Sequence, residues 1–549
     1  MQTAERWLAQ KNNQSVLLLL LGGLVFRAFV AFWLYPTFDE AYYYLYSLHL
    51  DWSYFDHPVL VALTTGFGPW LTGVVSQFTI RLGTLILYTG SLLLLYLTCR
   101  RLFSPKAAYL TLFVATISPI FEIGFGILTL PDSPLMFFWS ASLYCAAVEF
   151  FPQRGTKNEF YSSHLYLPSY RLAILGILVG LTCLSKYHGF ILGIGLIGFC
   201  LTSPPHRAVI RSPWAWLGLC LFFLTISPIL YWNIQHDWVS FRFQSKRAVP
   251  KRGYNLLDVG AVSLAEVLYL FPTIGFPLWW MSLRSAFSHT TQLFSHLSAK
   301  SQEDFQAKEF FILWVSLPLI LGFTLIGGYQ QILPAWSMPG FWGITLLLGQ
   351  QAMIWQQQSR QWVRRWLLGS GIAIATVLLI ALLQVTAGIV QKPSEYAVMG
   401  GFLSPKNDPS TELIDIQQLR RGFAESPVLS AALKNSSFIF TNRYYIGGPI
   451  AMSLSPLSHI PITCFDIGND LRGFAYWSRR DQWLGKDALY VTTAAFHNRE
   501  DLIASYKNHF SSLTEIGTIP IRRGGAVVNV IYVYQAKTLL KPYSRSYGI

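Results

Sequence analysis

The sequence has little charge for its length. Of its 549 residues only 12% are charged and 52% are hydrophobic, whereas an ordinary globular domain carries about 25% charged residues. A water-soluble chain of this composition would aggregate. Runs of about 20 apolar residues recur up to position 390, and each can cross the roughly 30 Å hydrocarbon layer as a helix. The composition therefore excludes an ordinary soluble enzyme and indicates a polytopic membrane protein.

Several other signals are missing. The six cysteines have no metal-type spacing, and five of them fall inside apolar runs, as small core residues do. No glycine-rich phosphate fingerprint follows a predicted strand, so we expect no nucleotide. The net charge of +14 comes without a basic stripe or a recognition motif, so we expect no nucleic acid partner. The first apolar run lacks a small-residue cleavage site and is predicted to remain as the first helix.

The apolar runs predict eleven membrane helices. They lie at 15–35, 78–99, 106–124, 132–151, 171–187, 188–203, 213–232, 257–281, 310–327, 332–350 and 367–390. With a cytoplasmic N-terminus every inner loop is basic, as the positive-inside rule requires. The outer segment "SFRFQSKRAVPKRGY" is basic as well. It is either a solvated loop, a miscounted span, or a cationic cradle for an anionic lipid or phosphate at the outer leaflet.

The composition changes after position 390. Short strands are predicted at "SSFIFTN", "ITCFDI", "ALYVTTAAF" and "GGAVVNVIYVYQA", with a helix at "REDLIASYKNHF". An odd number of spans places this part outside the cytoplasm. We predict a transmembrane domain at 1–390 and a small extracytoplasmic α/β domain at 391–549.

Unusual polar residues gather on the outer face of this topology. Five separate stretches contribute Asp39 and Glu40, Asp56 and His57, Asp132, Lys186 with Tyr187 and His188, and finally Asn233, His236, Asp237 and Arg242. Ionisable groups at a membrane boundary must be hydrated, paired or functional. Their convergence predicts a site on this face, although a single exposed acid or lysine is more often a solvated one.

The stretch "FDEAYYYLYSLHLDWSYFDHP" holds the most unusual acids. Aromatic and apolar residues recur at helical spacing after Asp39 and Glu40, which is typical of a helix lying in the membrane interface. Such a helix would hold the acids beside a cavity, and Asp39 is the stronger candidate of the two. The tyrosines are expected to form an interfacial aromatic belt, with stacking on sugars as the alternative.

Two charged residues lie at or inside apolar helices. Lys186 in "LSKYHGF" either snorkels to the surface or grips a phosphate that must become a leaving group. Burying the charged carboxylate of Glu266 in "SLAEVLYLF" within a membrane costs free energy unless it faces a cavity or a cation. It is a candidate for substrate binding.

The chain resembles bacterial membrane glycosyltransferases of the dolichyl-phosphate-mannose-protein mannosyltransferase-like family, relatives of the aminoarabinose and galacturonic acid transferases of lipid A. The matching stretches are the one with Asp39, "LTLPDSPLMFFWSASLY", "LSKYHGF", "SPILYWNIQHDWVSFRFQ" and "RRDQWLGKDALYV". The resemblance implies a C-type glycosyltransferase (GT-C) fold, a polyprenyl-phosphate sugar donor, and an inner-membrane location with the soluble domain outside. It also implies that Asp39 is the catalytic carboxylate residue of the first outer loop.

The resemblance and the residues together predict a mechanism. Asp39 would take a proton from an acceptor hydroxyl, and Glu40 or Asp132 would orient the acceptor or the base. Lys186 and Arg242, with Arg81 or Lys246, would stabilise the leaving phosphate. The further substrate-binding candidates are Tyr187, Asp56, His57, His236 and Glu266.

A single displacement would invert the anomeric centre. This chemistry requires no metal, although a divalent ion at Asp39, Glu40 and His57 is an alternative.

Two other functions compete with sugar transfer. A transporter or flippase of lipid-linked sugars usually has paired halves and charges deep in the bilayer. Here the halves do not repeat, and the polar cluster lies at one boundary. A scaffold acting through its outer domain would leave the polar cluster unexplained. The identity of the sugar and of the acceptor is not encoded in these motifs.

Overall fold

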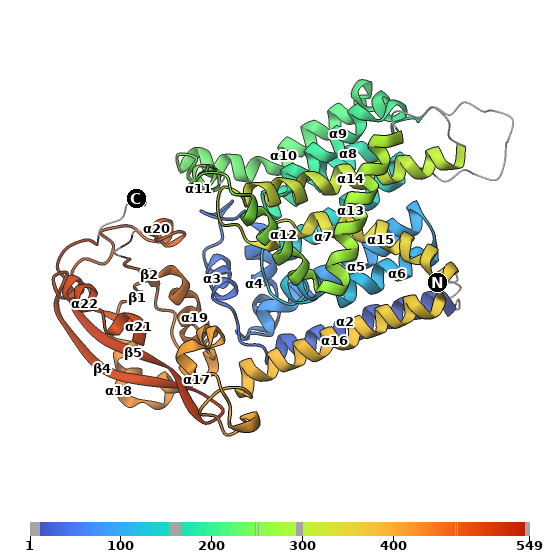
Figure 1. Ribbon diagram of the computed structural model, residues 1–549. Coiled ribbons are helices and arrows are strands. Elements are labelled where there is room, and N and C mark those ends of the chain that lie inside the picture. The colour runs from blue at the N-terminus through green and yellow to red at the C-terminus, as the bar shows by residue number, and fades with distance from the viewer. Residues whose placement is uncertain are drawn as a thin grey trace.

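The computed structural model describes residues 11–152, 166–247, 249–250, 252–292, 300–466, 468 and 470–543. Figure 1 shows a bundle of helices and, at the other end of the molecule, a smaller domain that contains a sheet. The principal bundle helices are α2 (Lys11–Trp33), α5 (Leu82–Leu102), α6 (Pro105–Ile117), α7 (Asp132–Phe150), α8 (Arg171–Ser185), α9 (Gly189–Thr202), α10 (Pro213–Gln235), α12 (Leu256–Leu270), α13 (Pro272–Gln292), α14 (Lys300–Ile326), α15 (Met338–Gln358) and α16 (Arg360–Ala387).

Within the described residues, five helices are long and apolar enough to cross a membrane, or six if α9 and the bent turn η3 (Pro204–Arg211) form one span. Others are shorter: α6 has 13 residues and α8 has 15. The predicted span 257–281 is wrong as a single helix. It breaks at Phe271, whose φ is 71°, because Pro272 follows and cannot continue the backbone hydrogen bonds of α12.

Two short helices of the segment predicted to be the first outer loop lie between the bundle and the smaller domain. They are α3 (Phe38–Leu48) and α4 (Leu60–Thr72). Thr37 begins α3 with a capping box: its hydroxyl accepts from the N–H of Glu40, and the Glu40 carboxylate accepts from the N–H of Thr37. This reciprocal pair satisfies two backbone donors and fixes where α3 starts.

The smaller domain has a five-stranded sheet in the order β2-β1-β3-β5-β4. β1 (Phe438–Thr441) pairs in parallel with β2 (Ile462–Cys464) and β3 (Ala488–Thr493), while β5 (Ala526–Leu539) is antiparallel to both β3 and β4 (Phe510–Arg523). The helices of this domain are α17 (Ile416–Glu425), α18 (Pro427–Asn435), α19 (Tyr444–Leu454), α20 (Phe474–Trp477), α21 (Ala494–His497) and α22 (Glu500–Lys507).

The smaller domain docks on α3. A Cβ added to Gly448 of α19 would lie 2.4 Å from the carbonyl carbon of Ala41, so only glycine allows this approach. The N–H of Gly473 donates to the Tyr42 hydroxyl at 2.9 Å. The expected interfacial belt of tyrosines is therefore wrong for α3. Its tyrosines Tyr42, Tyr43, Tyr44 and Tyr46 are at most 5% exposed, because the smaller domain covers them.

Candidate active site

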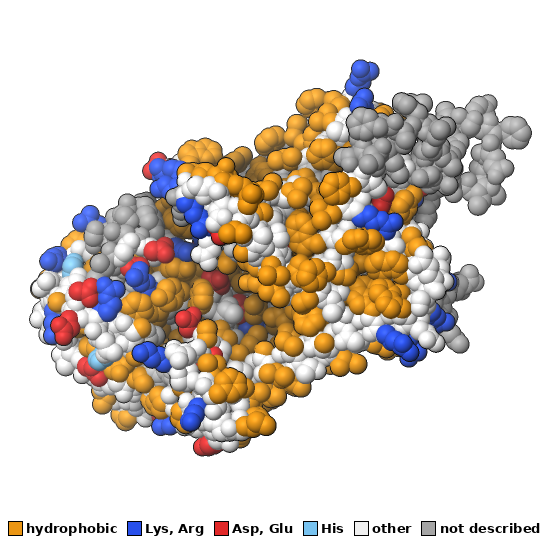
Figure 2. Space-filling model, viewed as in Figure 1, with side chains coloured by type: hydrophobic (Ala, Val, Ile, Leu, Met, Phe, Trp, Pro, Cys, Tyr) orange, Lys and Arg blue, Asp and Glu red, His pale blue; other side chains and the backbone are white. Residues whose placement is uncertain are grey.

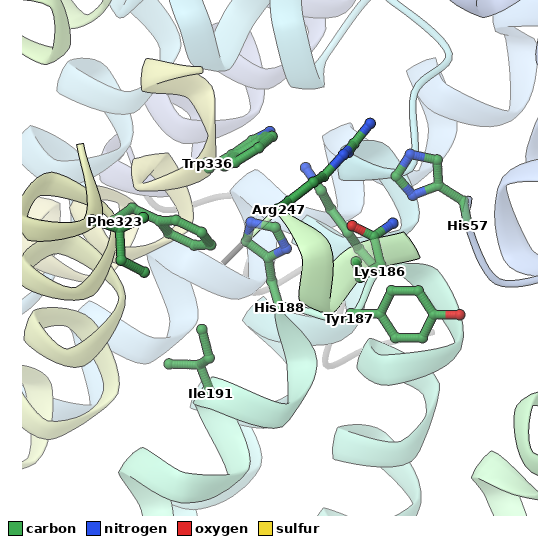
Figure 3. A pocket seen from close by; sticks show the side chains of 10 residues that line it. His57, Lys186, Tyr187, His188, Ile191, Arg247, Phe323 and Trp336 are labelled. Atoms are coloured by element: carbon green, nitrogen blue, oxygen red, sulfur yellow. The ribbon is translucent and has the colours of Figure 1, made fainter. Parts of the chain in front are cut away.

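A cavity of about 220 Å³ lies where α9, α11 (Val239–Lys246), α14 and the first outer loop meet. Four of its lining residues are of basic types: His57, Lys186, His188 and Arg247. Figure 3 shows Lys186 and Arg247 between His57 on one side and Phe323 and Trp336 on the other. Cationic side chains against an aromatic wall can hold an anionic group away from water.

Lys186 ends α8 and turns its side chain towards α7. Its ammonium group donates to both carboxylate oxygens of Asp132, at 2.8 and 2.9 Å. Both side chains are almost fully buried, at 8% and 9% exposure. The structure thus joins two predicted site residues that are 54 positions apart, and Asp132 orients Lys186.

The basic outer segment divides between two faces of α11. Arg242 and Lys246 are four residues apart, so they share one face, and both are exposed to solvent. Phe243 and Arg247, each one residue further along, share a neighbouring face about 100° away. There the Arg247 guanidinium lies 4.3 Å from the Phe243 ring centroid and lines the cavity. The structure places neither Arg242 nor Lys246 in the cavity, and it places Arg247 there instead.

Asp39 is half-buried in the first turn of α3. Within the described ranges its carboxylate accepts no hydrogen bond, unlike the other acids of this region. Burial raises its pKa to about 6; Asp56 and Glu40 add to the rise, while Arg472 and Arg247 oppose it. A carboxyl with this pKa can exchange a proton near neutral pH.

Glu40 and Arg81 are both fully buried and bound to each other. Arg81 donates to the two Glu40 oxygens at 2.7 Å each and also to the carbonyls of Ala31, Leu34 and Tyr35. The N–H of Thr129 donates to Glu40 at 3.0 Å. Because all these groups are engaged, neither side chain faces the cavity. The pair joins the end of α2, the first turn of α3 and the start of α5, which Arg81 precedes.

Asp56 is buried and is held by the smaller domain. Arg472 donates to it at 2.9 Å, and the Tyr46 hydroxyl donates to its other oxygen. Burial alone would raise the pKa of Asp56, but Arg472 holds it below its ordinary value. Burial also lowers the pKa of His57 to about 3, with Lys186 and Arg247 acting in the same direction. His57 is therefore a neutral imidazole at the cavity wall.

The remaining predicted residues have different positions. Tyr187 lines the cavity and packs 5.5 Å from the ring of Phe241. His236 lies outside the cavity, stacked 4.0 Å from Trp232, and its Nδ1 hydrogen-bonds the Trp232 carbonyl. Glu266 is buried on α12 and accepts from the Thr324 hydroxyl at 3.0 Å, one residue from Phe323 of the cavity wall.

The described residues contain no cluster of three or more His, Cys, Asp or Glu with metal-site geometry. In particular, the carboxylate of Glu40 is used by Arg81 and two backbone N–H groups. A divalent ion shared by Asp39, Glu40 and His57 would have to displace these contacts. The donor set does not fit that ion.

Among the residues that sequence reasoning did not single out are Arg247 and Trp336 of the cavity wall and Arg472, which binds Asp56. Arg247 had a detectable signal, because its four-residue spacing from Phe243 marks the apolar face of α11. Trp336, in the turn η4 (Pro334–Trp336), lies two residues before α15 begins. Arg472 gave no local signal, since its partner is 416 positions away.

The chain combines a bundle of apolar helices of membrane-spanning length, a cavity with Lys186 and Arg247 in its wall, and a docked α/β domain. Residues 56–232 match the family described as dolichyl-phosphate-mannose-protein mannosyltransferase, so the predicted resemblance is confirmed.

Among the relatives is the lipid A galacturonosyltransferase RgtD of Rhizobium johnstonii, which is 25% identical over 347 residues; the match spans 61% of this chain and 65% of that protein. The apo structure of ArnT from Cupriavidus metallidurans superposes with a TM-score of 0.56 at 14% identity, covering 95% of this chain and 98% of ArnT. ArnT bound to undecaprenyl phosphate gives a TM-score of 0.54 at 13% identity, covering 94% and 97%. These structures establish the shared fold.

Proposed function

We propose that the protein is a membrane glycosyltransferase that moves a sugar from a polyprenyl-phosphate donor to an extracytoplasmic acceptor. The observation that carries the proposal is the Asp39 carboxylate, which accepts no hydrogen bond from the described residues. Asp39 does not line the cavity, but Arg247 of the cavity wall acts electrostatically on it. The relationship to RgtD and the ArnT complex with undecaprenyl phosphate support a polyprenyl-phosphate donor.

In the proposed reaction an acceptor hydroxyl attacks the anomeric carbon of the donor sugar. The new bond joins the acceptor oxygen to that carbon, the bond from the carbon to the phosphate oxygen breaks, and the polyprenyl phosphate leaves with the electron pair. Asp39 takes the hydroxyl proton. Lys186 and Arg247 stabilise the charge that develops on the phosphate. A single displacement inverts the anomeric centre.

The other predicted residues take supporting roles. Asp132 orients Lys186, and Asp56 holds the outer loop that presents His57. Glu40 and Arg81 position α3 from below rather than contacting substrate. Tyr187 and His57 form part of the wall around the phosphate. No metal is needed, because phosphate is already a good leaving group.

The proposed topology follows from the positive-inside rule. The N-terminus and the basic loops lie on the cytoplasmic side of a bacterial inner membrane. Up to eleven apolar segments enter the bilayer, and the domain after position 390 lies on the other side. The acceptor would be a glycolipid, a polysaccharide or a protein on that outer face.

The decisive test is Asp39→Asn, assayed in membranes with a labelled lipid-linked sugar. Loss of a general base lowers the rate by about 10²- to 10⁴-fold, while donor binding should persist. Glu425→Gln, which changes an exposed acid of the soluble domain, is the matched control. A near wild-type rate in Asp39→Asn would remove Asp39 from the base role. The product also separates transfer from translocation, since a flippase would release no free polyprenyl phosphate.

A further inference from the structure

A groove rich in arginine lies at the end of the bundle farthest from the α/β domain. Its lining comes from α6, α15 and the first turns of α16, and its volume is about 750 Å³. The residues that line it are Tyr109, Leu110, Phe113, Gln356, Arg360, Gln361, Val363, Arg364, Leu367 and Leu368. A second cavity of about 490 Å³ shares Gln361, Arg364 and Leu368 with it and adds Arg365. We call the two together the arginine groove.

The polar half of the arginine groove carries uncompensated positive charge. Within the described residues, Arg360, Arg364 and Arg365 form no ion pair, and no carboxylate lines either cavity. All three side chains are exposed. Arg360 is also the first residue of α16, where the helix dipole adds positive potential. The chemistry that complements this set is a phosphate group, because guanidinium binds phosphate oxygens in a bidentate manner.

The other half of the arginine groove is apolar. Leu110 and Phe113 of α6 face Val363, Leu367 and Leu368 of α16 across it. Leu368 is 46% exposed. This wall continues into the apolar surface of α16, which runs beside α2 for the length of the bundle (Figure 1). A ligand with an anionic head and an acyl tail fills both halves, whereas a free phosphate fills only one.

An independent feature indicates at which level of the membrane the arginine groove lies. Trp355, Trp362 and Trp366 form an aromatic cluster at the same level of α15 and α16, with ring centroids 5.6 to 5.9 Å apart. Tryptophans concentrate at the headgroup level of a bilayer. Figure 2 shows a few separate basic side chains at this end of the molecule, and apolar side chains cover the surface between this end and the α/β domain.

We propose that the arginine groove is a binding site for one anionic glycerophospholipid of the inner leaflet, with its phosphate on Arg360, Arg364 and Arg365 and an acyl chain along Leu110, Phe113 and Leu368. The site is separate from the proposed sugar-transfer site. It would fix the cytoplasmic end of α16, whose other end leads into the α/β domain.

The test is native mass spectrometry of the delipidated full-length protein, titrated with phosphatidylglycerol or with phosphatidylcholine of the same acyl chains. The wild type should bind one phosphatidylglycerol more tightly than phosphatidylcholine. In R360Q/R364Q/R365Q the Kd for phosphatidylglycerol should rise about 10- to 100-fold, with phosphatidylcholine unchanged. R360K/R364K/R365K should retain most of the affinity, since it keeps the charge.

The matched control is R207Q/R211Q, which removes two exposed arginines of η3 that line neither cavity. It should bind phosphatidylglycerol as the wild type does. Equal losses in the control and in the triple variant would overturn the proposal in favour of diffuse surface charge. Unchanged binding by the triple variant would overturn it directly. Competition by inorganic phosphate at concentrations similar to those of the lipid would show that the ligand is a free anion.

Discussion

At the residue scale, the difference between the adjacent acids Asp39 and Glu40 is central. Glu40 is fully buried and its carboxylate is bound by Arg81 and two backbone N–H groups. Asp39 accepts no hydrogen bond from the described residues and is half-buried. A saturated carboxylate serves structure, whereas an unpartnered one keeps its lone pairs for a substrate proton. The two neighbours therefore have different functions.

The pH dependence of transfer should report on Asp39. Its pKa is raised to about 6, so the proton-accepting carboxylate forms as the pH rises through 6. We expect the transfer rate to increase through that range and to level off above it. The groups that act on Asp39 are Arg472, Asp56, Glu40 and Arg247. In Arg472→Gln a cation that lowers the pKa is lost, so the rise should move to higher pH. Arg499→Gln, an exposed arginine of the α/β domain, should leave the profile unchanged.

Lys186 should be needed for departure of the phosphate. Removing one stabilising donor from a developing negative charge typically costs about 10²- to 10³-fold in kcat, and we expect Lys186→Met to show this loss. Lys186→Arg should recover part of the rate because it keeps a cation beside Asp132. The measurement is kcat and KM for the lipid-linked donor. If Lys186→Met changed neither constant, the lysine would serve only to pair with Asp132.

These residues also show how far the sequence alone could lead. Charge at the end of an apolar helix is costly, so a charged residue there is predicted to have a function. This argument identifies Asp39, Lys186 and Asp132. If the basic segment is a loop, its sequence gives no reason to prefer Arg247 to Arg242 or Lys246. Once α11 forms, helical spacing separates the exposed pair from the cavity-facing residue. Arg472 depends on a contact between distant segments, which no local pattern encodes.

At the element scale, α3 is positioned by the charge pair beneath it. Breaking a buried ion pair by removing one partner costs about 3 to 5 kcal/mol, because the other charge is left uncompensated. Glu40→Gln should therefore lower the unfolding temperature of the purified protein markedly, since Arg81 would face three carbonyls but no anion.

The control for this prediction is Asp304→Asn, which breaks the partly exposed pair with Lys308 on α14. Exposed pairs contribute about 0 to 1 kcal/mol, so the unfolding temperature should hardly change. Equal unfolding temperatures for Glu40→Gln and the wild type would mean that α3 does not depend on the pair.

The elements were predicted unevenly. Long apolar runs gave α2 and α10 close to their observed bounds, since length and hydropathy are properties of one segment. The helix α16 begins at Arg360, well before the predicted start at position 367. The break between α12 and α13 was missed, although Pro272 marked it. In the α/β domain β4 was missed, because most side chains in its first nine residues are exposed or half-buried on both faces, so hydrophobic and polar residues do not alternate there.

At the scale of the whole molecule, the α/β domain is part of the site. Its Arg472 binds Asp56 of the first outer loop, and its helix α19 packs against α3 through Gly448. The same domain covers the tyrosines of α3, which the sequence placed in the membrane interface. The helix that carries Asp39 is thus held from below by Arg81 and from outside by the α/β domain.

Undocking this domain should impair transfer without touching the reacting groups. In Gly448→Val the new Cβ would lie 2.4 Å from the Ala41 carbonyl carbon and 2.5 Å from the Tyr42 nitrogen. Because both are backbone atoms of α3, the clash cannot be relieved by a side-chain rotation. We expect α19 to separate from α3 and the rate of hydrogen exchange in residues 38–58 to rise. The kcat should fall as the protection of these residues from exchange is lost.

Gly369→Val on α16, where a Cβ meets nothing within 4 Å, is the control and should match the wild type. Faster exchange with full activity would show that the domain shields α3 but is not required for catalysis, and unchanged exchange would show that α3 tolerates the displacement of α19.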